Sequence, residues 1–342
     1  MQLLNTHERK LAGIARGVRA AIVLPLLFAL SLVVIGKPGM AGFTVFGTFA
    51  HLVMVDYSTS KGARLAESGT LTVLGAVLVT LGTGASTNLW LAVASAAGAG
   101  CLSQFPTEWL APVRAKVSVL RSALLMTFML AVAVPTPLHS LPPLLGGWLL
   151  AGLVAQVALR WLWLPIRSGD LAASPNDGPP TLSGNAVSSG ASMGLAVLVA
   201  RLLSLDHAFW VVLGVAPVLA ASRRSPSYTF GRQQAGTLLG FLSGLILVAG
   251  VGAHQWWYWI ALPFTVFIAA YLSSAVGFMA GQAGFTAFAV VLFCILTPLQ
   301  RHVGIVRIED IAIGGAISLL VGSLQQLGPS LKWRAWRRSG PG

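Results

Sequence analysis

The chain has 342 residues, of which 56% are hydrophobic and only 9% are charged. Soluble domains carry about 25% charged residues, so this composition excludes an aqueous globular fold and indicates a protein that lies in the bilayer. A formal net charge of +13 would suggest nucleic acid as a partner of a soluble protein, but here the basic residues gather at the ends of apolar blocks. Retention of Lys and Arg on the cytoplasmic side produces that pattern, with anionic lipids as the partner.

The apolar blocks predict twelve membrane helices, because a helix needs about 20 residues to cross about 30 Å of hydrocarbon. Six are expected near residues 18–35, 39–55, 65–82, 89–105, 117–134 and 141–162, and six near 184–203, 208–221, 233–251, 257–272, 277–296 and 308–327. A polar stretch rich in Pro and Gly separates the two sets. We therefore divide the chain into an N-terminal six-helix membrane repeat (1–164), a cytoplasmic linker (165–183), a C-terminal six-helix membrane repeat (184–328) and a basic cytoplasmic tail (329–342).

The two halves share residues in one constant register, which indicates an internal duplication. The matched positions are Gly47 with Gly214, Gly69 to Leu71 with Gly236 to Leu238, and Trp90 with Trp257. An even number of spans per copy makes the copies parallel, and the positions of Lys and Arg place both termini in the cytoplasm. The predicted fold class is an all-α integral membrane protein of about 12 transmembrane helices, arranged as two parallel six-helix repeats.

Three stretches of the second half resemble a known family. They are HAFWVVLG at 207–214, GRQQAGTLLG at 231–240, and AGQAGFTAFAVVLF followed by VGIVRIEDIAIGGAISLLVG between 280 and 322. They resemble the fusaric acid resistance and aromatic acid exporter family of bacterial inner-membrane proteins. The resemblance implies proton-driven efflux of aromatic carboxylic acids and related toxic compounds, sometimes with a periplasmic adaptor. It is only general in the first half, and the chain lacks the large cytoplasmic domain of bigger members.

Two adjacent carboxylates open the last predicted helix on the outer side. Glu309 and Asp310 follow Arg307, and carboxylates beside an arginine can hold one proton between them, as a proton-coupled antiporter requires. Adjacent helical positions point about 100° apart, so only one of the two carboxylates can face the neighbouring helices. We assign Glu309 and Asp310 to proton coupling and Arg307 to substrate binding; a helix N-terminal cap is the alternative for the acids.

A second proton-coupling candidate lies where the eighth helix is expected to begin. Asp206 and His207 stand together there, and histidine titrates near neutral pH. Trp210 follows one turn later as a candidate substrate contact. The alternative for this group is an interfacial cap beside a residue of the aromatic belt.

Polar residues within or beside other spans are candidates for the substrate path. Arg232 and Gln233 lie at the predicted inner mouth, and Gln282 lies in a Gly-rich segment of a membrane helix, where transporters often expose backbone to substrate. Positive-inside retention explains Arg232 equally well. The isolated polar residues His51 and Glu67 are expected to be satisfied by hydrogen bonds between helices.

Small residues recur four apart in both copies. Such spacing lets helix backbones approach closely. We therefore expect helix packing at Gly236, Thr237 and Gly240, and at Gly69 and Thr70 in the first copy.

Secondary active efflux is the function that fits these features best. The chain contains no Walker motif for ATP and no HExxH metal motif, so we expect neither enzymatic activity nor a metal or other cofactor. The expected partners are a small organic anion, membrane lipids and, from the family, a periplasmic adaptor; a homo-oligomer stays open. A passive channel and a structural subunit of an envelope complex are the alternatives.

Overall fold

The computed structural model describes residues 2–58, 60–103, 119, 122–162, 182–205, 208–219, 226–252, 254–296 and 309–324. These residues are helical with short connections, and no strand occurs among them. Composition predicted this all-α fold, because a helix satisfies its own backbone hydrogen bonds inside hydrocarbon. The expected linker and basic tail fall almost wholly outside the described residues.

The described part of the first half contains three π-helical segments. α1 (Gln2–Ala29) continues into the π-helix η1 (Leu30–Val34), and α2 (Pro38–Phe49) continues into the π-helix η2 (Ala50–Met54). The other elements are α3 (Lys61–Ser86), α4 (Leu89–Leu102), the π-helix η4 (Ala123–Phe128), α6 (Met129–Ala133), the 3₁₀ turn η5 (Leu138–Ser140) and α7 (Leu141–Trp161). π-Helical turns are rare and often occur at functional sites.

The described part of the second half consists of α-helices without π-helical turns. They are α8 (Leu182–Leu202), α9 (Phe209–Leu219), α10 (Pro226–Val251), α11 (Gln255–Ala275) and α12 (Phe278–Leu296), followed by a helical segment at 309–324. Gly277 separates α11 from α12 with a φ of 129°, a conformation that side chains disfavour.

Six helices of the described chain are long and apolar enough to cross a membrane. They are Lys10–Val34, Lys61–Ser86, Leu138–Trp161, Tyr228–Val251, Gln255–Ala275 and Phe278–Leu296. Shorter apolar helices occur at Pro38–Met54, Leu89–Leu102 and Ala186–Leu202. The chain is therefore a multi-pass membrane protein, while the expected number of twelve spans stays a prediction.

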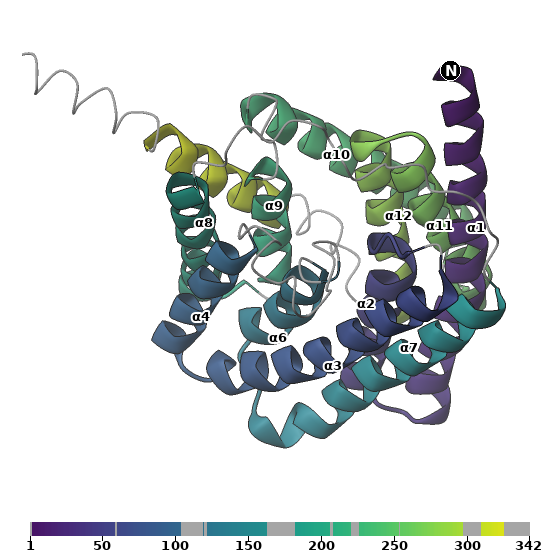
Figure 1. Ribbon diagram of the computed structural model, residues 1–342, viewed down its shortest axis with the longest axis horizontal. Helices are drawn as coiled ribbons and strands as arrows, with labels where there is room; N and C mark the ends of the chain where they lie inside the picture. The colour runs from purple at the N-terminus through teal and green to yellow at the C-terminus, as the bar shows by residue number, and fades with distance from the viewer. Residues whose placement is uncertain are drawn as a thin grey trace, which may run out of the picture.

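The two halves are joined by two long helix contacts. α1 packs along α11, which in turn packs on α12, and α4 packs along α8. Figure 1 shows these two contacts on opposite sides of the molecule. Within the first half, α2 and α3 both pack on α7. α1 of the first half thus packs on the second half, and α8 of the second half packs on the first.

Arg201, at the end of α8, ties the second half to the ends of α3 and α6. Its Nε donates to the carbonyl of Ala133 at 2.8 Å, and its Nη2 donates to the carbonyls of Ser86 at 2.8 Å and Val132 at 2.9 Å. The last carbonyls of a helix have no partner within that helix. Arg201 therefore supplies donors to carbonyls at the ends of two helices of the first half.

We expect Arg201→Met to destabilise the protein by about 1–3 kcal/mol, since it leaves these carbonyls without a donor. Arg160→Met is the matched control, because Arg160 is exposed on α7 beside Trp161. Thermal unfolding of both variants in detergent measures the difference. Equal melting temperatures for the two variants would contradict a clamping role for Arg201.

Candidate functional site

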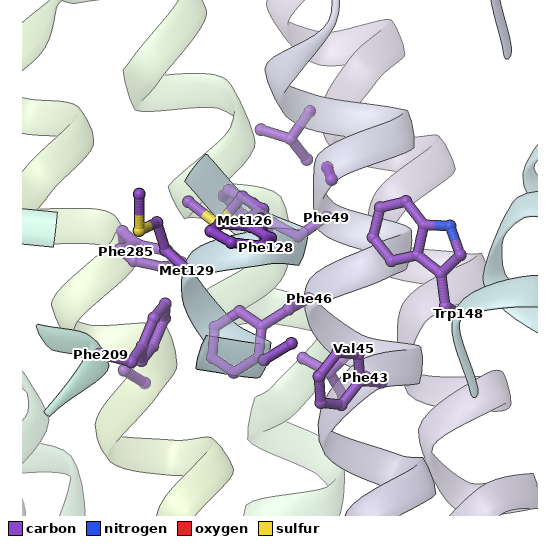
Figure 2. Close-up of a cluster of buried hydrophobic side chains, with 14 of the residues drawn as sticks. Phe43, Val45, Phe46, Phe49, Met126, Phe128, Met129, Trp148, Phe209 and Phe285 are labelled. Carbon is purple, nitrogen blue, oxygen red and sulfur yellow. The ribbon is translucent and has the colours of Figure 1, made fainter. Parts of the chain in front are cut away.

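An aromatic core joins the two halves of the protein. It consists of Phe46 and Phe49 of α2, Phe209 and Trp210 of α9, and Phe285 and Phe288 of α12, all of them buried. The ring centroids are 5.1 Å apart for Phe46 and Phe209, and 4.9 Å apart for Phe49 and Phe285. Figure 2 shows Met126, Phe128 and Met129 of η4 and α6 packed beside these rings. Flat rings and flexible thioethers fill this core by close packing.

Trp210 lies at the centre of this aromatic core. Its side chain is 0% exposed, and its ring centroid lies 6.1 Å from that of Phe46, 6.1 Å from that of Phe285 and 6.2 Å from that of Phe293. A residue of the interfacial belt would instead be exposed at the membrane surface. Trp210 therefore contacts other aromatic residues between the halves.

The two carboxylates of the last helical segment have different surroundings. Asp310 is 1% exposed, whereas Glu309 is exposed at the start of the segment. Gly214 of α9 packs against the backbone of Ile311, which brings this segment onto α9. The two carboxylates differ in exposure because neighbouring helical positions point about 100° apart. The other candidates of this outer region, Arg307, Asp206 and His207, lie outside the described residues.

Arg232, Gln233 and Gln282 lie along the contact between α10 and its neighbours. Gln233 is 0% exposed, and its Nε2 donates to the carbonyl of Leu213 in α9 at 3.3 Å. The Arg232 guanidinium lies 5.7 Å from the ring centroid of Tyr228. Gln282 of α12 lies directly against Gly236, one turn after Arg232. The fold thus brings Gln282 near the predicted inner mouth, while Gln233 faces α9.

The glycines of α10 lie where α10 crosses α12. A side chain added at Gly236 or Gly240 would meet the backbone carbonyls of Met279 and Ala283, respectively. Thr237 is buried between them, and its hydroxyl donates to the carbonyl of Gln233 at 2.9 Å. Close backbone approach is what small residues at this spacing allow.

The packing expected at Gly69 and Thr70 differs from the observed arrangement. No atom lies within 4 Å of the position that a Cβ would take at Gly69, and Thr70 is only half-buried, whereas Thr237 is 0% exposed. α3 instead approaches its neighbours at Gly75, against Trp148, and at Gly82, against α6. The shared Gly-Thr-Leu triplet therefore does not mark equivalent contacts in the two halves.

A charged cluster at the predicted cytoplasmic end holds residues 55–58 against α1 and α3 and ties α3 to α7. Arg16 pairs with Asp56, and Arg64 donates from Nε to the carbonyl of Leu159 at 3.3 Å. Glu67 accepts from the backbone N–H of Ser58 at 2.8 Å and from its hydroxyl. Ser58 lies in the connection before α3, so these two bonds are not the hydrogen bonds between helices that were expected for Glu67. The cluster as a whole was missed, because the predicted helix began at residue 65 and left Arg64 in the loop before it, whereas α3 begins at Lys61.

A GxSxG sequence occurs in α8, where its two glycines pack against α4. Residues 190–194 read GASMG, the spacing of the hydrolase nucleophile elbow, which requires a turn between a strand and a helix. Here the stretch lies inside a helix, Ser192 is 0% exposed, and Gly190 and Gly194 face α4. The geometry of these residues does not support a nucleophile.

Comparison with known protein families finds a match in the second half of the chain. Residues 195–321 match the family described as fusaric acid resistance protein-like. The match confirms the resemblance carried by the three stretches, and it includes Trp210, Gln233, Gln282 and Asp310. No curated protein and no solved structure matches the chain.

Proposed function

We propose, from the match of residues 195–321 to the fusaric acid resistance protein-like family, that this chain exports small aromatic or other organic anions across the bacterial inner membrane. The observation that carries the proposal is that the match falls on a multi-pass helical protein with six helices of membrane length. A proton gradient drives the export. One charge moving through about 100 mV releases about 2.3 kcal/mol, enough for an approximately fiftyfold solute gradient.

The proposed architecture has twelve spans in two parallel repeats, with both termini in the cytoplasm. In that arrangement α8 corresponds to α1, and α11 corresponds to α4. The contact of α1 with α11 and that of α4 with α8 then become equivalent when the halves are exchanged. This reciprocal packing supports a duplication, and parallel repeats can alternate access by rocking.

The proposed substrate site lies at the junction between the halves. Because Phe49 of α2 touches both Phe285 and Phe288 of α12, rocking of the halves would separate these rings and leave two apolar faces. The ring of an aromatic anion would then contact the two separated faces in place of the contacts that Phe49 makes with Phe285 and Phe288. Arg232 and Gln282 are the proposed polar contacts for its carboxylate, and Asp310 is the proposed proton acceptor.

Export is tested in a bacterial strain that lacks other aromatic acid exporters. Cells expressing the chain are expected to accumulate at least about threefold less radiolabelled benzoate and fusarate than cells with an empty vector. The periplasmic adaptor implied by the family is tested by supplying or omitting one. Equal accumulation with and without the chain, in both settings, would contradict the proposal.

The aromatic core sets a further expectation. Phe49→Leu keeps the volume apolar but removes a ring, so transport of benzoate is expected to fall about threefold to tenfold relative to an aliphatic carboxylate. Phe264→Leu is the matched control, because Phe264 is 65% exposed on α11. Competition between labelled benzoate and unlabelled hexanoate measures the preference. An unchanged preference in Phe49→Leu would place the substrate elsewhere.

A further inference from the structure

His51 is a fully buried histidine between three helices of the first half. It lies in the π-helix η2 and is 0% exposed. Its Nδ1 lies 2.8 Å from the carbonyl oxygen of Gly47, and its Nε2 lies 3.1 Å from Oγ1 of Thr72 in α3. Both ring nitrogens therefore have a hydrogen-bond partner. The contact with Thr72 is the expected bond between helices, whereas Gly47 lies one turn back in the same helix.

The hydrogen atoms of this group can be counted. A carbonyl oxygen only accepts, so Nδ1 carries a hydrogen and donates to Gly47. The Thr72 hydroxyl has one hydrogen and two acceptors in reach, His51 Nε2 and the carbonyl of Ser68 at 2.9 Å. If it donates to Nε2, the ring is neutral. If it donates to Ser68, Nε2 must itself donate to Oγ1, and the ring is an imidazolium.

The same heavy-atom positions therefore fit two protonation states that differ by one proton. Gln156 of α7 donates from Nε2 to the Thr72 hydroxyl oxygen at 3.4 Å, and Trp148 Nε1 donates to the Thr72 carbonyl at 2.9 Å. Both bonds hold Thr72 in place in either state. The rings of Trp148 and His51 are 5.2 Å apart, within the range at which an indole stabilises a cation.

The charged groups on the surrounding elements do not pair with His51. Among the described side chains they are Lys10, Arg16 and Arg19 on α1, Lys37 before α2, Asp56 after η2, Lys61, Arg64 and Glu67 on α3, and Arg160 on α7. Within the described chain the hydrogen-bond partners of His51 are Gly47 and Thr72 alone. In the arrangement with a neutral ring, Nε2 is the atom that takes up a proton when water reaches it.

We propose that His51 carries the transported proton through the first half, with the Thr72 hydroxyl switching its donation between His51 Nε2 and the Ser68 carbonyl. The proton forms an N–H bond at Nε2 and leaves from the same atom; the Thr72 hydroxyl rotates and keeps its own hydrogen. The π-helical turn places His51 for this exchange. The inference rests on the proton-coupled export proposed above and adds a second proton site to Asp310.

The test uses the full chain in proteoliposomes with a pH dye inside and labelled benzoate as the probe. His51→Gln is expected to keep substrate counterflow within about twofold of wild type and to lower substrate-coupled proton flux at least about tenfold. His254→Gln is the matched control, because His254 is exposed before α11. Coupled proton flux at the wild-type level in His51→Gln overturns the proposal.

If His51→Gln does not fold, substitutions at Thr72 test whether its hydroxyl is needed for proton coupling. Thr72→Ser keeps the hydroxyl and is expected to couple as wild type, whereas Thr72→Val removes it and is expected to lower coupled flux at least about threefold with counterflow retained. Equal coupling in these two variants overturns the switch.

A wild type without counterflow would contradict the proposed function itself. ¹⁵N-histidine NMR, with His51→Gln for assignment, then tests His51 directly. A gain of hydrogen at Nε2, with Nδ1 still protonated, is expected as pH falls from about 8 to about 4. A neutral ring throughout overturns the proposal.

Discussion

The double variant Glu309→Gln/Asp310→Asn is expected to abolish proton-driven export while the protein stays folded in the membrane. Asp310 is 1% exposed in the segment that packs on α9, and an amide of nearly the same size cannot take up and release a proton. Without coupling, the approximately fiftyfold gradient that one proton supports falls to equilibration. Accumulation of labelled benzoate in inverted vesicles measures the loss.

The single variants separate the two carboxylates. Glu309 is exposed, so Glu309→Gln alone is expected to change accumulation by less than about twofold, whereas Asp310→Asn alone should reproduce the double variant. Full accumulation by the double variant, with normal amounts of protein in the membrane, would remove both residues from proton coupling.

A second large effect is expected where α10 crosses α12. Gly240→Ala places a methyl group against the backbone carbonyl of Ala283, and backbone cannot move aside as a flexible side chain does. We expect a loss of about 1–3 kcal/mol from overpacking, with little folded protein recovered in detergent. Gly→Ala inside a helix otherwise gains up to about 1 kcal/mol.

Gly69→Ala is the matched control for this substitution. It lies inside the membrane-length helix α3, and no atom lies within 4 Å of the added Cβ position. Its melting temperature is expected to equal or exceed that of wild type, because only the gain in helix propensity remains. Similar melting of the two variants, measured by size-exclusion recovery after heating, would show that the α10–α12 contact tolerates a methyl group.

The apolar blocks located helices well where both ends of a helix are apolar. The helix predicted at 141–162 corresponds to α7, Leu141–Trp161, and the helix predicted at 277–296 corresponds to α12, Phe278–Leu296. α10 was expected from 233 but begins at Pro226, because polar residues extend a helix beyond the hydrocarbon. α3 likewise begins at Lys61, where Ser60 caps it by accepting from Ala63 N–H.

The site was harder to predict because its parts come from distant segments. Trp210 was singled out, but its contacts with Phe46 and Phe285 depend on the packing of α2 against α9 and α12. The π-helical turn at His51 has no signal in a segment that is apolar on every face. At Gly69 the shared triplet predicted a packing face, although neighbouring helices decide which face of α3 is covered.

Uptake of labelled aromatic carboxylates by inverted membrane vesicles, with and without a protonophore, tests proton-coupled export most directly. The account predicts accumulation above equilibrium that the protonophore abolishes and that vesicles without the chain do not show. Uptake that only equilibrates, and that the protonophore leaves unchanged, would contradict it in favour of a passive channel.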